Sequence, residues 1–463
     1  MKIHRIAACL FAAFAVHGTL AAGGPSSSAA PYLDASAPGV EFVAILTAGD
    51  AAQADKTYRM AGVPDGLGAY DNGNGSMTVL MNHELRRGTG AVRAHGAAGA
   101  FISQWTIRKR DLTVLEGRDF VRTVKLWGTQ GYASGPGAGF SRLCSADLAA
   151  PSAFFNGKTG KGLQGARLFM NGEEDSRGRP RGFAHVVGGD GHGIAYELPK
   201  LGNRPFENLL ANPFEQDKTI VAATEDGGEN KVYFYVGEKQ AEGNAVERAG
   251  LANGVTYELV IDGYSDDDPA DGFRAGSFRL VREGGTVLAR PEDGAWDVRD
   301  PRRFYFVTTA SFKGNSRLWE VRFHDIREPE RGGDIRVLLD GAKAGFRMLD
   351  NIAVDGDGNV YLQEDVGNHP RLGKIWRFNG DTGVLTLLAQ HDARYFLRGG
   401  ADFLSEDEES SGIVEVSELF RGVEGYDLGR NRYFLLTVQT HHKLPGELVE
   451  GGQLLLMKVA RQP

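Results

Sequence analysis

The sequence contains very little cysteine, with two residues in a chain of 463. Cys9 falls in an apolar stretch, residues 6–16, that follows two basic residues and is too short to span a bilayer. This pattern predicts a Sec-type signal peptide over residues 1–22, and hence a periplasmic or secreted mature protein. Cys144 is then the one thiol of the mature chain, so no internal disulfide can form. The sequence leaves three alternative roles for Cys144: a small buried hydrophobic side chain, a reactive thiol, or a thiolate that binds a metal ion.

Two other features are absent from the sequence. No second apolar segment is long enough to cross a membrane, and no long stretch shows the apolar spacing of a helix. The 64 glycines are typical of many turns between short strands, which predicts an all-β fold. Residues 23–39 predict a flexible lead-in, and residues 40–463 a single domain. With 60 acidic and 52 basic side chains, the chain is a poor partner for nucleic acid or anionic membranes.

Six short apolar runs each end in polar residues. The ends are His83-Glu84, Glu173-Glu174, Glu225-Asp226, Thr308-Thr309, Glu364-Asp365 and His441-His442. Any one of them is typical of a strand entering a polar turn. Together, at intervals long enough for about four short strands each, they predict a six-bladed β-propeller with long inter-blade loops. A linear string of β-sandwich domains is the alternative, although it would not require a polar end on every repeat.

Strand ends that converge on one channel would bring many carboxylates together. Carboxylates without counter-cations repel one another, so the mouth of the channel is predicted to be a metal site. The predicted ligands are Glu84, Glu173, Glu174, Glu225, Asp226, Glu364 and Asp365. Hard oxygen ligands suit calcium, magnesium or ferric iron, and a thiolate from Cys144 would add a transition metal beside calcium. His83 and His441-His442 are either ligands, general acids or structural residues.

Three further segments predict loops or turns. Residues 62–68 predict a tight turn, residues 128–165 an irregular glycine-rich loop, and residues 404–411, with four acids and three serines, an exposed loop. In the segment that starts at Ala289, Pro291 fixes the backbone between Arg290 and Glu292. Arg290 could grip an anionic substrate there, or form a surface ion pair with Glu292 on a turn.

Several pieces, in order along the chain, resemble the PhoX-type alkaline phosphatases. They are Met60-Ala-Gly-Val-Pro-Asp-Gly-Leu-Gly-Ala, Val79-Leu-Met-Asn-His-Glu, Arg142-Leu-Cys-Ser, Gly172-Glu-Glu, Thr224-Glu-Asp-Gly, Val232-Tyr-Phe-Tyr-Val-Gly, Ala289-Arg-Pro-Glu-Asp and Asp350-Asn-Ile-Ala-Val-Asp with Gly358-Asn-Val-Tyr. The resemblance implies a six-bladed propeller that hydrolyses phosphate monoesters at a cluster of calcium and iron (Fe³⁺). We expect a monomer that acts on a small-molecule phosphate ester, without a nucleic-acid or membrane partner.

The same resemblance implies roles for individual residues. Cys144 matches the iron-bound cysteine of the family, Glu173, Glu225 and Glu292 match cluster ligands, and Arg290 matches the residue that grips phosphate. Two features depart from the family: the signal has no twin arginine, and Val260 stands where the family carries a lysine. A calcium-dependent lactonase or esterase propeller, and a non-catalytic calcium-stabilised binding propeller, are the alternative functions.

Overall fold

The computed structural model describes residues 23–267 and 272–461, and strands dominate them. The helices among these residues are short: α1 (Pro151–Phe154), α2 (Ala245–Arg248), α3 (Gly341–Ala344) and α4 (Ala393–Phe396), with 3₁₀ turns η1 (Pro199–Leu201), η2 (Pro329–Arg331), η3 (Ser417–Phe420) and η4 (Gly446–Leu448). The all-β prediction is therefore confirmed. The expected signal peptide, residues 1–22, lies outside the described residues. Within those residues, no helix has the length and apolar character needed to cross a membrane.

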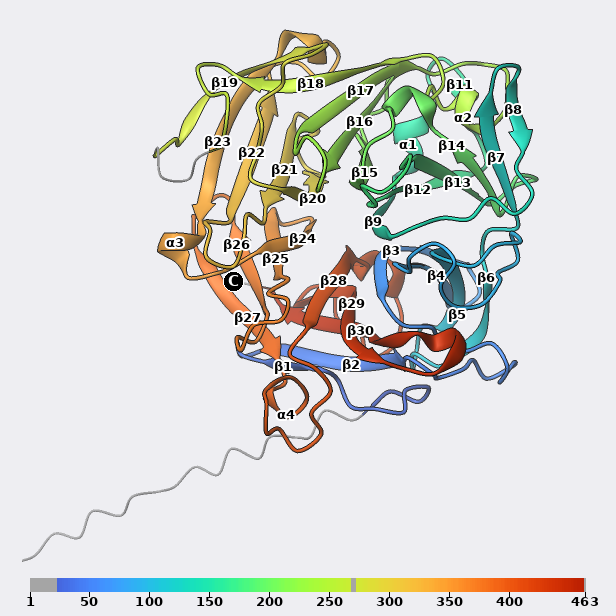
Figure 1. The fold of residues 1–463 in the computed structure, drawn as a ribbon, viewed down its shortest axis with the longest axis vertical. Helices are drawn as coiled ribbons and strands as arrows, with labels where there is room; N and C mark the ends of the chain where they lie inside the picture. Colours follow the sequence, from blue (N-terminus) through green and yellow to red (C-terminus); the bar gives the residue numbers. More distant parts are fainter. Residues whose placement is uncertain (1–22, 268–271, 462–463) are drawn as a thin grey trace, which may run out of the picture.

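The strands form sheets that surround a common centre (Figure 1). One sheet has the order β3 (Pro64–Asp71), β4 (Ser76–His83), β5 (Phe101–Arg108), β6 (Val114–Asp119). The next runs β9 (Leu143–Leu148), β12 (Arg167–Glu173), β13 (Gly182–Val187), β14 (Ile194–Glu197), β7 (Thr123–Gly128), β8 (Gly131–Ser134). A separate short hairpin pairs β10 (Phe155–Asn156) with β11 (Lys161–Gly162).

The remaining sheets complete the circuit. A nine-stranded sheet runs β15 (Phe206–Ala211), β16 (Lys218–Glu225), β17 (Val232–Glu238), β18 (Val255–Ile261), β19 (Ala275–Val281), β23 (Gly333–Asp340), β22 (Arg317–Phe323), β21 (Arg303–Thr308), β20 (Pro291–Trp296). A five-stranded sheet runs β24 (Leu349–Val354), β25 (Asn359–Glu364), β26 (Lys374–Asn379), β27 (Leu385–His391), β1 (Leu33–Ala35). A four-stranded sheet runs β28 (Glu408–Glu415), β29 (Asn431–Lys443), β30 (Glu450–Ala460), β2 (Val40–Thr47).

The strands nearest the centre form a closed ring. In order they are β3, β9, β15, β20, β24 and β28; each contacts the next, and β28 contacts β3. We call these the inner strands. They approach so closely that a Cβ on Gly66 of β3 would lie 2.4 Å from the backbone nitrogen of Ala146 on β9. A closed ring of antiparallel sheets fits the β-propeller architecture, which leaves only short and protected sheet edges.

The hydrophobic core lies between the faces of neighbouring sheets. One cluster joins Met77 and Trp105 of the first sheet to Leu435 and Leu454 of the last. Another places Phe234 of β17 against Trp296, Phe304 and Phe323, with ring centroids 5.1 to 6.2 Å apart. Burial of such large side chains is the main favourable term that holds one sheet against the next.

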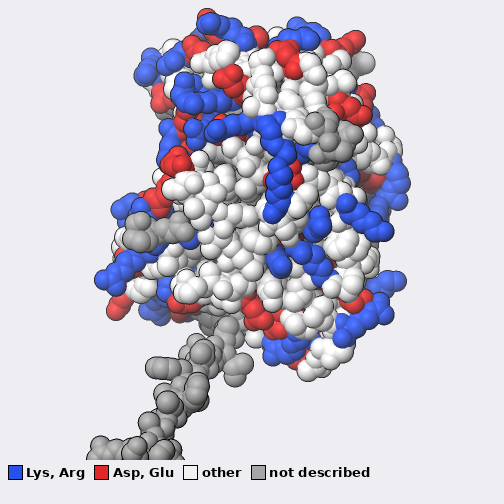
Figure 2. All heavy atoms as spheres, turned by 90° about the vertical axis from the view of Figure 1, so that its left-hand side faces the viewer, with Lys and Arg blue, Asp and Glu red and all other residues white. Residues whose placement is uncertain are grey.

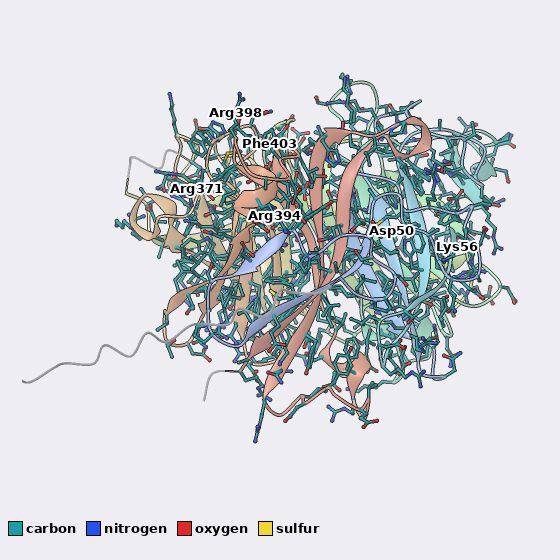
Figure 3. The ribbon with its side chains drawn as sticks, turned by 90° about the horizontal axis from the view of Figure 1, so that it is seen from below. Asp50, Lys56, Arg371, Arg394, Arg398 and Phe403 are labelled. Carbon is teal, nitrogen blue, oxygen red and sulfur yellow. The ribbon has the colours of Figure 1, made fainter. Side chains whose placement is uncertain are left out.

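The first strands of the chain pair with late strands. β1 pairs with β27, and β2 pairs with β30, as Figure 3 shows from below. Residues 23–39 predict a flexible lead-in by composition, but the structure places Leu33–Ala35 in a strand. The reason is that Tyr32 and Leu33 are buried against β27 and its neighbours, and this burial offsets the cost of ordering the segment.

Both signs of charge occur on the face of the molecule that Figure 2 presents. Lys and Arg mix with Asp and Glu around its margins, while uncharged atoms cover much of its middle. This face carries no continuous basic surface of the kind that binds nucleic acid.

Three inner strands replace predicted loops or turns. The structure shows β3 where residues 62–68 predict a turn, β9 within the segment 128–165, and β28 where residues 404–411 predict an exposed loop. Their residues are polar or small because one side faces the centre and the other faces a neighbouring strand. The outer members of the sheets, such as β4, β5, β16, β17 and β25, occur where the apolar runs predict them.

A substitution in β2 tests whether this strand stabilises the ring. Leu46 is fully buried in the core cluster between the first and last sheets. We expect Leu46→Ala to lower the free energy of unfolding by about 2–5 kcal/mol, because a large buried side chain is lost. Val384→Ala is the control, since Val384 is 50 % exposed and should change stability by less than about 0.5 kcal/mol. Urea denaturation measures both, and equal effects would contradict a role of β2 in closure.

Candidate metal centre

One local arrangement recurs on the inner strands. On each inner strand, one residue pairs with a residue at or near the end of a neighbouring strand of the same sheet, which we call the second strand. The pairs are Pro64 with His83, Leu143 with Glu173, Phe206 with Glu225, Pro291 with Thr308, Leu349 with Glu364 and Glu408 with Thr440. The residue that follows on the inner strand is Asp65, Cys144, Glu207, Glu292, Asp350 and Glu409, respectively. We call these residues the inner set. They are acidic in every case but one, and the exception is the thiol.

An irregularity in strand pairing accompanies the inner set. The register of β3, β9, β15, β20 and β24 shifts at or directly after this residue. On β28 the shift comes later, between Ser411 and Ile413. A β-bulge bends its strand and changes the direction of a side chain, and bulges are common beside functional sites. The shifts therefore account for side chains that leave the sheets and meet at the centre.

Backbone strain marks the same strands. Val63, Arg142, Arg290 and Met348 have positive φ angles of 50°, 44°, 58° and 42°, and each stands two residues before a member of the inner set. Left-handed φ in residues other than glycine costs of order 1 kcal/mol and persists where the surrounding structure imposes it. Its repetition at equivalent positions indicates that the placement of the inner set is imposed by the fold.

A second set of side chains follows the second strands. Five of these residues directly follow the end of a second strand: Glu84, Glu174, Asp226, Thr309 and Asp365. The sixth, His441, lies near the end of β29, and we call the six residues the outer set. Successive residues of a strand point to opposite sides. One residue of each predicted pair therefore faces the centre while the other packs within its own sheet.

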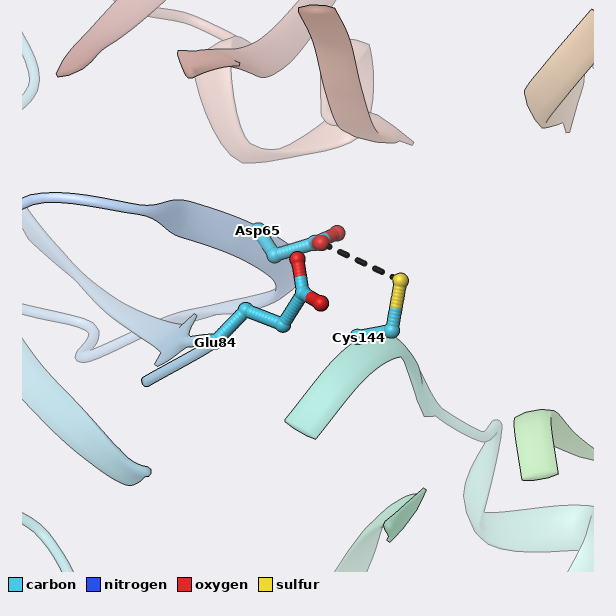
Figure 4. A group of neighbouring side chains, drawn as sticks. All are labelled: Asp65, Glu84 and Cys144. Carbon is cyan, nitrogen blue, oxygen red and sulfur yellow. Dashed lines mark hydrogen bonds between the residues drawn. The ribbon is translucent and has the colours of Figure 1, made fainter. Parts of the chain in front are cut away.

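All six members of the inner set and three of the outer set come together in four groups of three among the described residues. They are Asp65–Glu84–Cys144, Cys144–Glu174–Glu207, Glu207–Glu292–Asp350 and Asp350–Asp365–Glu409. In each group, one ligand atom per residue lies within 4.8 Å of the others. Consecutive groups share Cys144, Glu207 or Asp350, so they form one continuous arc. Figure 4 shows the first group, in which the Cys144 thiol donates to Asp65 Oδ2 over 3.3 Å.

The arc concentrates negative charge in a buried place. Burial, with the repulsion of neighbouring carboxylates, raises the pKa of Asp65, Glu292 and Asp350 well above their usual range. Burial also raises the pKa of Glu207 to about 8 and that of Asp365 to about 7. The Cys144 thiol is raised in pKa by burial first and by Asp65 second. Such an arrangement is stable either protonated or with bound cations.

The donors that the arc offers fit metal ions. Asp65 Oδ1, Glu207 Oε2 and Asp350 Oδ1 are buried, and none of them has a hydrogen-bond partner among the described residues. Unpartnered buried oxygens are costly, and a cation would satisfy them. Carboxylate oxygens suit calcium or ferric iron, and one thiolate favours a transition metal at its position. The residues therefore fit a cluster of hard cations that includes one softer position.

Two arginines stand at equivalent positions beside the arc. Arg290 donates through Nε and Nη2 to Asp226 over 2.9 and 2.7 Å, and through Nη2 to Glu292 over 3.2 Å. Arg142 donates to Glu84 over 2.7 Å and to Glu174 over 2.6 Å. Their side chains are 43 % and 30 % exposed, and neither Nη1 group has a partner among the described residues. Each guanidinium is thus fixed by carboxylates with donors left for an anion.

Four of the predicted ligands lie outside the four groups. One is Asp226, which accepts from Arg290, and the other three are Glu173, Glu225 and Glu364. Glu173 accepts from Arg87 and Arg181 over 2.7 and 2.9 Å. Glu225 accepts from the Tyr233 hydroxyl over 2.7 Å. Glu364 accepts from Trp376 and from Arg371, which is labelled in Figure 3. These carboxylates belong to the strand ends whose side chains face their own sheets.

The histidines and Val260 have distinct surroundings. His83 is buried between Ser103 and the Gly62 carbonyl, stacks on Phe101 with centroids 4.2 Å apart, and has a pKa lowered to about 3 by burial. His441 lies at the outer set, 2.7 Å from Glu450. Val260 lies on β18, three strand spacings or roughly 14 Å from β15. Val260 pairs with Arg279 of β19 and therefore lies away from the inner strands, within the nine-stranded sheet.

Four members of the arc are not among the ligands predicted from the sequence: Asp65, Glu207, Asp350 and Glu409. A short repeat nevertheless accompanies the inner set. The tripeptides are Pro64-Asp-Gly, Leu143-Cys-Ser, Phe206-Glu-Asn, Pro291-Glu-Asp and Leu349-Asp-Asn, each an apolar residue or proline, a ligand, and a small or polar residue. Only β28 departs from this pattern, with Glu408-Glu-Ser. This repeat is the sequence signal that could have located the inner strands.

The fold and the arc together define an all-β protein that fits a β-propeller with a metal-type centre. No family model matches the chain, and a search of curated proteins found no significant match. Among solved structures, PhoX of Pseudomonas fluorescens in complex with vanadate, a transition-state analogue, superposes with a TM-score of 0.64 and 9 % identity. The match covers 94 % of this chain and 97 % of that one. The chain has a PhoX-like fold.

Two other solved structures are more distant. A protein of unknown function from Dyadobacter fermentans gives a TM-score of 0.45 at 11 % identity, covering 92 % of this chain and 100 % of that one. A putative 6-phosphogluconolactonase from Bacteroides uniformis gives a TM-score of 0.33 at 10 % identity, covering 82 % and 95 %.

Glu173 and Glu174 are adjacent in the chain, but only Glu174 belongs to the arc. Substituting each of them tests whether their side chains face opposite sides of the strand. We expect Glu174→Gln to reduce the bound metal, because Glu174 belongs to the arc, while the unfolding free energy of chelator-treated protein stays the same or rises. We expect Glu173→Gln to destabilise the chelator-treated protein by about 3 kcal/mol, because Arg181 loses its buried carboxylate. Elemental analysis and urea denaturation give the two measurements. Loss of metal in Glu173→Gln together with loss of stability in Glu174→Gln would contradict the assignment of Glu174 to the arc and of Glu173 to its own sheet.

Proposed function

We propose that the chain is an exported, metal-dependent phosphatase that hydrolyses phosphate monoesters, and also diesters, at an iron- and calcium-containing cluster. The proposal includes a six-bladed propeller, in which the nine-stranded sheet is two blades joined through β19 and β23. One ring position per blade then explains why the inner set has six members. A monomeric protein in the periplasm or outside the cell, produced through a Sec-type signal, is part of the same proposal.

The observation that carries this proposal is the arc of ligand groups with shared members. Because successive groups share Cys144, Glu207 and Asp350, the arc would hold several metal ions close together. A single calcium that stabilises a binding propeller would need only one of the groups. The PhoX-like fold favours the same reaction. The solved PhoX structure that shares this fold is a complex with vanadate, a transition-state analogue.

The residues of the arc would hold the metals as follows. Cys144 and its neighbours Asp65, Glu84, Glu174 and Glu207 would hold iron, and Glu292, Asp350, Asp365 and Glu409 would hold calcium. Bound metal ions would supply Lewis-acid stabilisation of the charge on phosphoryl oxygens. Asp226 fixes Arg290. Glu173 and Glu225 remain candidate ligands through the family resemblance, and Glu364 through its position at a strand end. Their present partners favour a role in holding the strand ends.

Arg290 is the residue proposed to touch the substrate. Its Nη1 donors are directed to no other group among the described residues, so they are available to a phosphoryl oxygen. In the hydrolysis, an oxygen from water forms a bond to phosphorus as the bond from phosphorus to the ester oxygen breaks. The alcohol leaves with a proton, and phosphate is the second product. Arg290, fixed by Asp226 and Glu292, holds the phosphoryl group in line for this displacement.

Metal content is the first test. We expect the mature protein, purified without chelators or metal-affinity tags, to contain both iron and calcium by elemental analysis. Cys144→Ser should lose iron and keep calcium, because the hydroxyl is a poor ligand for the softer position. Calcium alone, with no change in Cys144→Ser, would contradict the cluster and favour the lactonase or binding-propeller alternatives.

Hydrolysis of p-nitrophenyl phosphate is the second test. We expect phosphate release by the metal-loaded protein, and a loss of about 100-fold in kcat/KM in Arg290→Ala, because a charged donor to the transition state is removed. Glu292→Gln should lose activity together with metal. The control is Arg421→Ala, since Arg421 is 70 % exposed and pairs with Glu418 on the surface. Absence of activity on every phosphomonoester and diester, with iron and calcium supplied, would overturn the proposal.

A further inference from the structure

A pocket of about 370 Å³ lies directly beside the metal centre. Its lining includes three members of the arc, Glu84, Asp365 and Glu409, together with Arg142 and the segment that follows Glu84. Water occupies about 30 Å³ per molecule in the liquid, so the pocket has room for about ten non-hydrogen atoms. A small organic group fits there while still in contact with the arc.

Arg290 is not part of this pocket's lining. Arg290 directly precedes β20 and donates to Asp226, whereas the pocket lies beside the ends of β4 and β25 and beside β28 and β29. If a phosphoryl group binds between Arg290 and the arc, the alcohol portion of the ester needs a separate space next to the arc. The pocket is a space of suitable size that adjoins the arc.

Most charged groups of the pocket have a partner of opposite charge. Arg142 is paired with Glu84, and His441 lies 2.7 Å from Glu450. Arg86 also lines the pocket, is exposed, and makes no ion pair or side-chain hydrogen bond with any described residue. Its position is defined by a turn in which its carbonyl accepts from the Thr89 amide over 3.0 Å.

The carboxylates of the pocket do not prevent an anion from binding. Glu84 and Glu450 are neutralised by their partners, and Asp365 and Glu409 belong to the last metal group of the arc. With cations bound to that group, Arg86 becomes an unbalanced positive charge at the rim. An arginine without a carboxylate partner is suited to bidentate binding of a carboxylate or phosphate.

We propose that this pocket holds the leaving group of the phosphomonoester, and that Arg86 selects leaving groups that carry a second negative charge, such as a carboxylate. This inference rests on the proposed phosphatase function and names its substrate class. Arg86 is a specificity-determining residue in this assignment, and it takes no part in breaking the ester bond. Its effect is therefore on KM for anionic substrates.

Two substrates of nearly equal size test the assignment. 3-Phosphoglycerate ends in a carboxylate, and glycerol 3-phosphate ends in a neutral hydroxymethyl group. We expect the wild-type protein to prefer 3-phosphoglycerate. Arg86→Ala should reduce kcat/KM for 3-phosphoglycerate about tenfold, through KM, and change that for glycerol 3-phosphate less than twofold. Arg86→Lys should retain most of the preference, because the charge is kept.

The controls separate this inference from the function on which it rests. Metal content and thermal stability of Arg86→Ala should equal those of the wild type, and Arg421→Ala should leave both substrates unaffected. If the wild type hydrolyses both esters and Arg86→Ala changes neither or both equally, the role of Arg86 is overturned while the phosphatase stands. If the wild type hydrolyses neither ester nor any other phosphate ester, the proposed function fails, and the substrate class fails with it.

Discussion

Mutual repulsion of buried carboxylates is the constraint around which this molecule is organised. Each inner strand delivers one ionisable side chain to the same small volume, and burial raises the pKa of most of them. The sheets, their bulges and the strained residues before Asp65, Cys144, Glu292 and Asp350 hold these groups together against that repulsion. A fold selected for stability alone would place apolar residues at the centre, so the arrangement favours the proposal that the centre binds cations.

Outer strands such as β16 and β25 were predictable from the sequence, whereas three inner strands, β3, β9 and β28, lie where the sequence predicts a turn or a loop. Runs such as residues 219–225 show the β-branched and apolar residues of a strand with two covered faces, and the structure confirms them as β16. The strand β28 begins with Glu-Glu-Ser-Ser, which is typical of a solvated loop. Its residues are buried nevertheless, because they face a polar centre on one side and adjacent strands on the other. Hydrophobic pattern reports contact with apolar surroundings, and an inner strand has few such contacts.

The candidate site was predicted in the same uneven way. Convergence of acidic strand ends on one mouth follows from repeats around an axis, and it placed Glu84, Glu174 and Asp365 in the arc together with Cys144. The alternation of side chains along a strand divides each acidic pair, so Glu173, Glu225 and Glu364 face their own sheets. Distinguishing the two members requires the strand register to within one residue. Asp65 and Glu409 lie on strands where the sequence predicts a turn or a loop. Glu207 and Asp350 lie near the beginnings of β15 and β24, whereas the prediction considered only acidic residues that follow an apolar run.

The pairing of early and late strands has a consequence for the order of assembly. Asp65 accepts a hydrogen bond from Gln439, 374 positions later in the chain, and β2 completes the sheet of β28, β29 and β30. The arc therefore exists only when the two ends of the chain have met. The groups that contain Cys144 come from residues 65–207, and the group of Asp350, Asp365 and Glu409 comes from residues 350–409, so only the closed ring holds all the groups in one place. Under the proposed function, chain closure would come first and loading of the full metal cluster second.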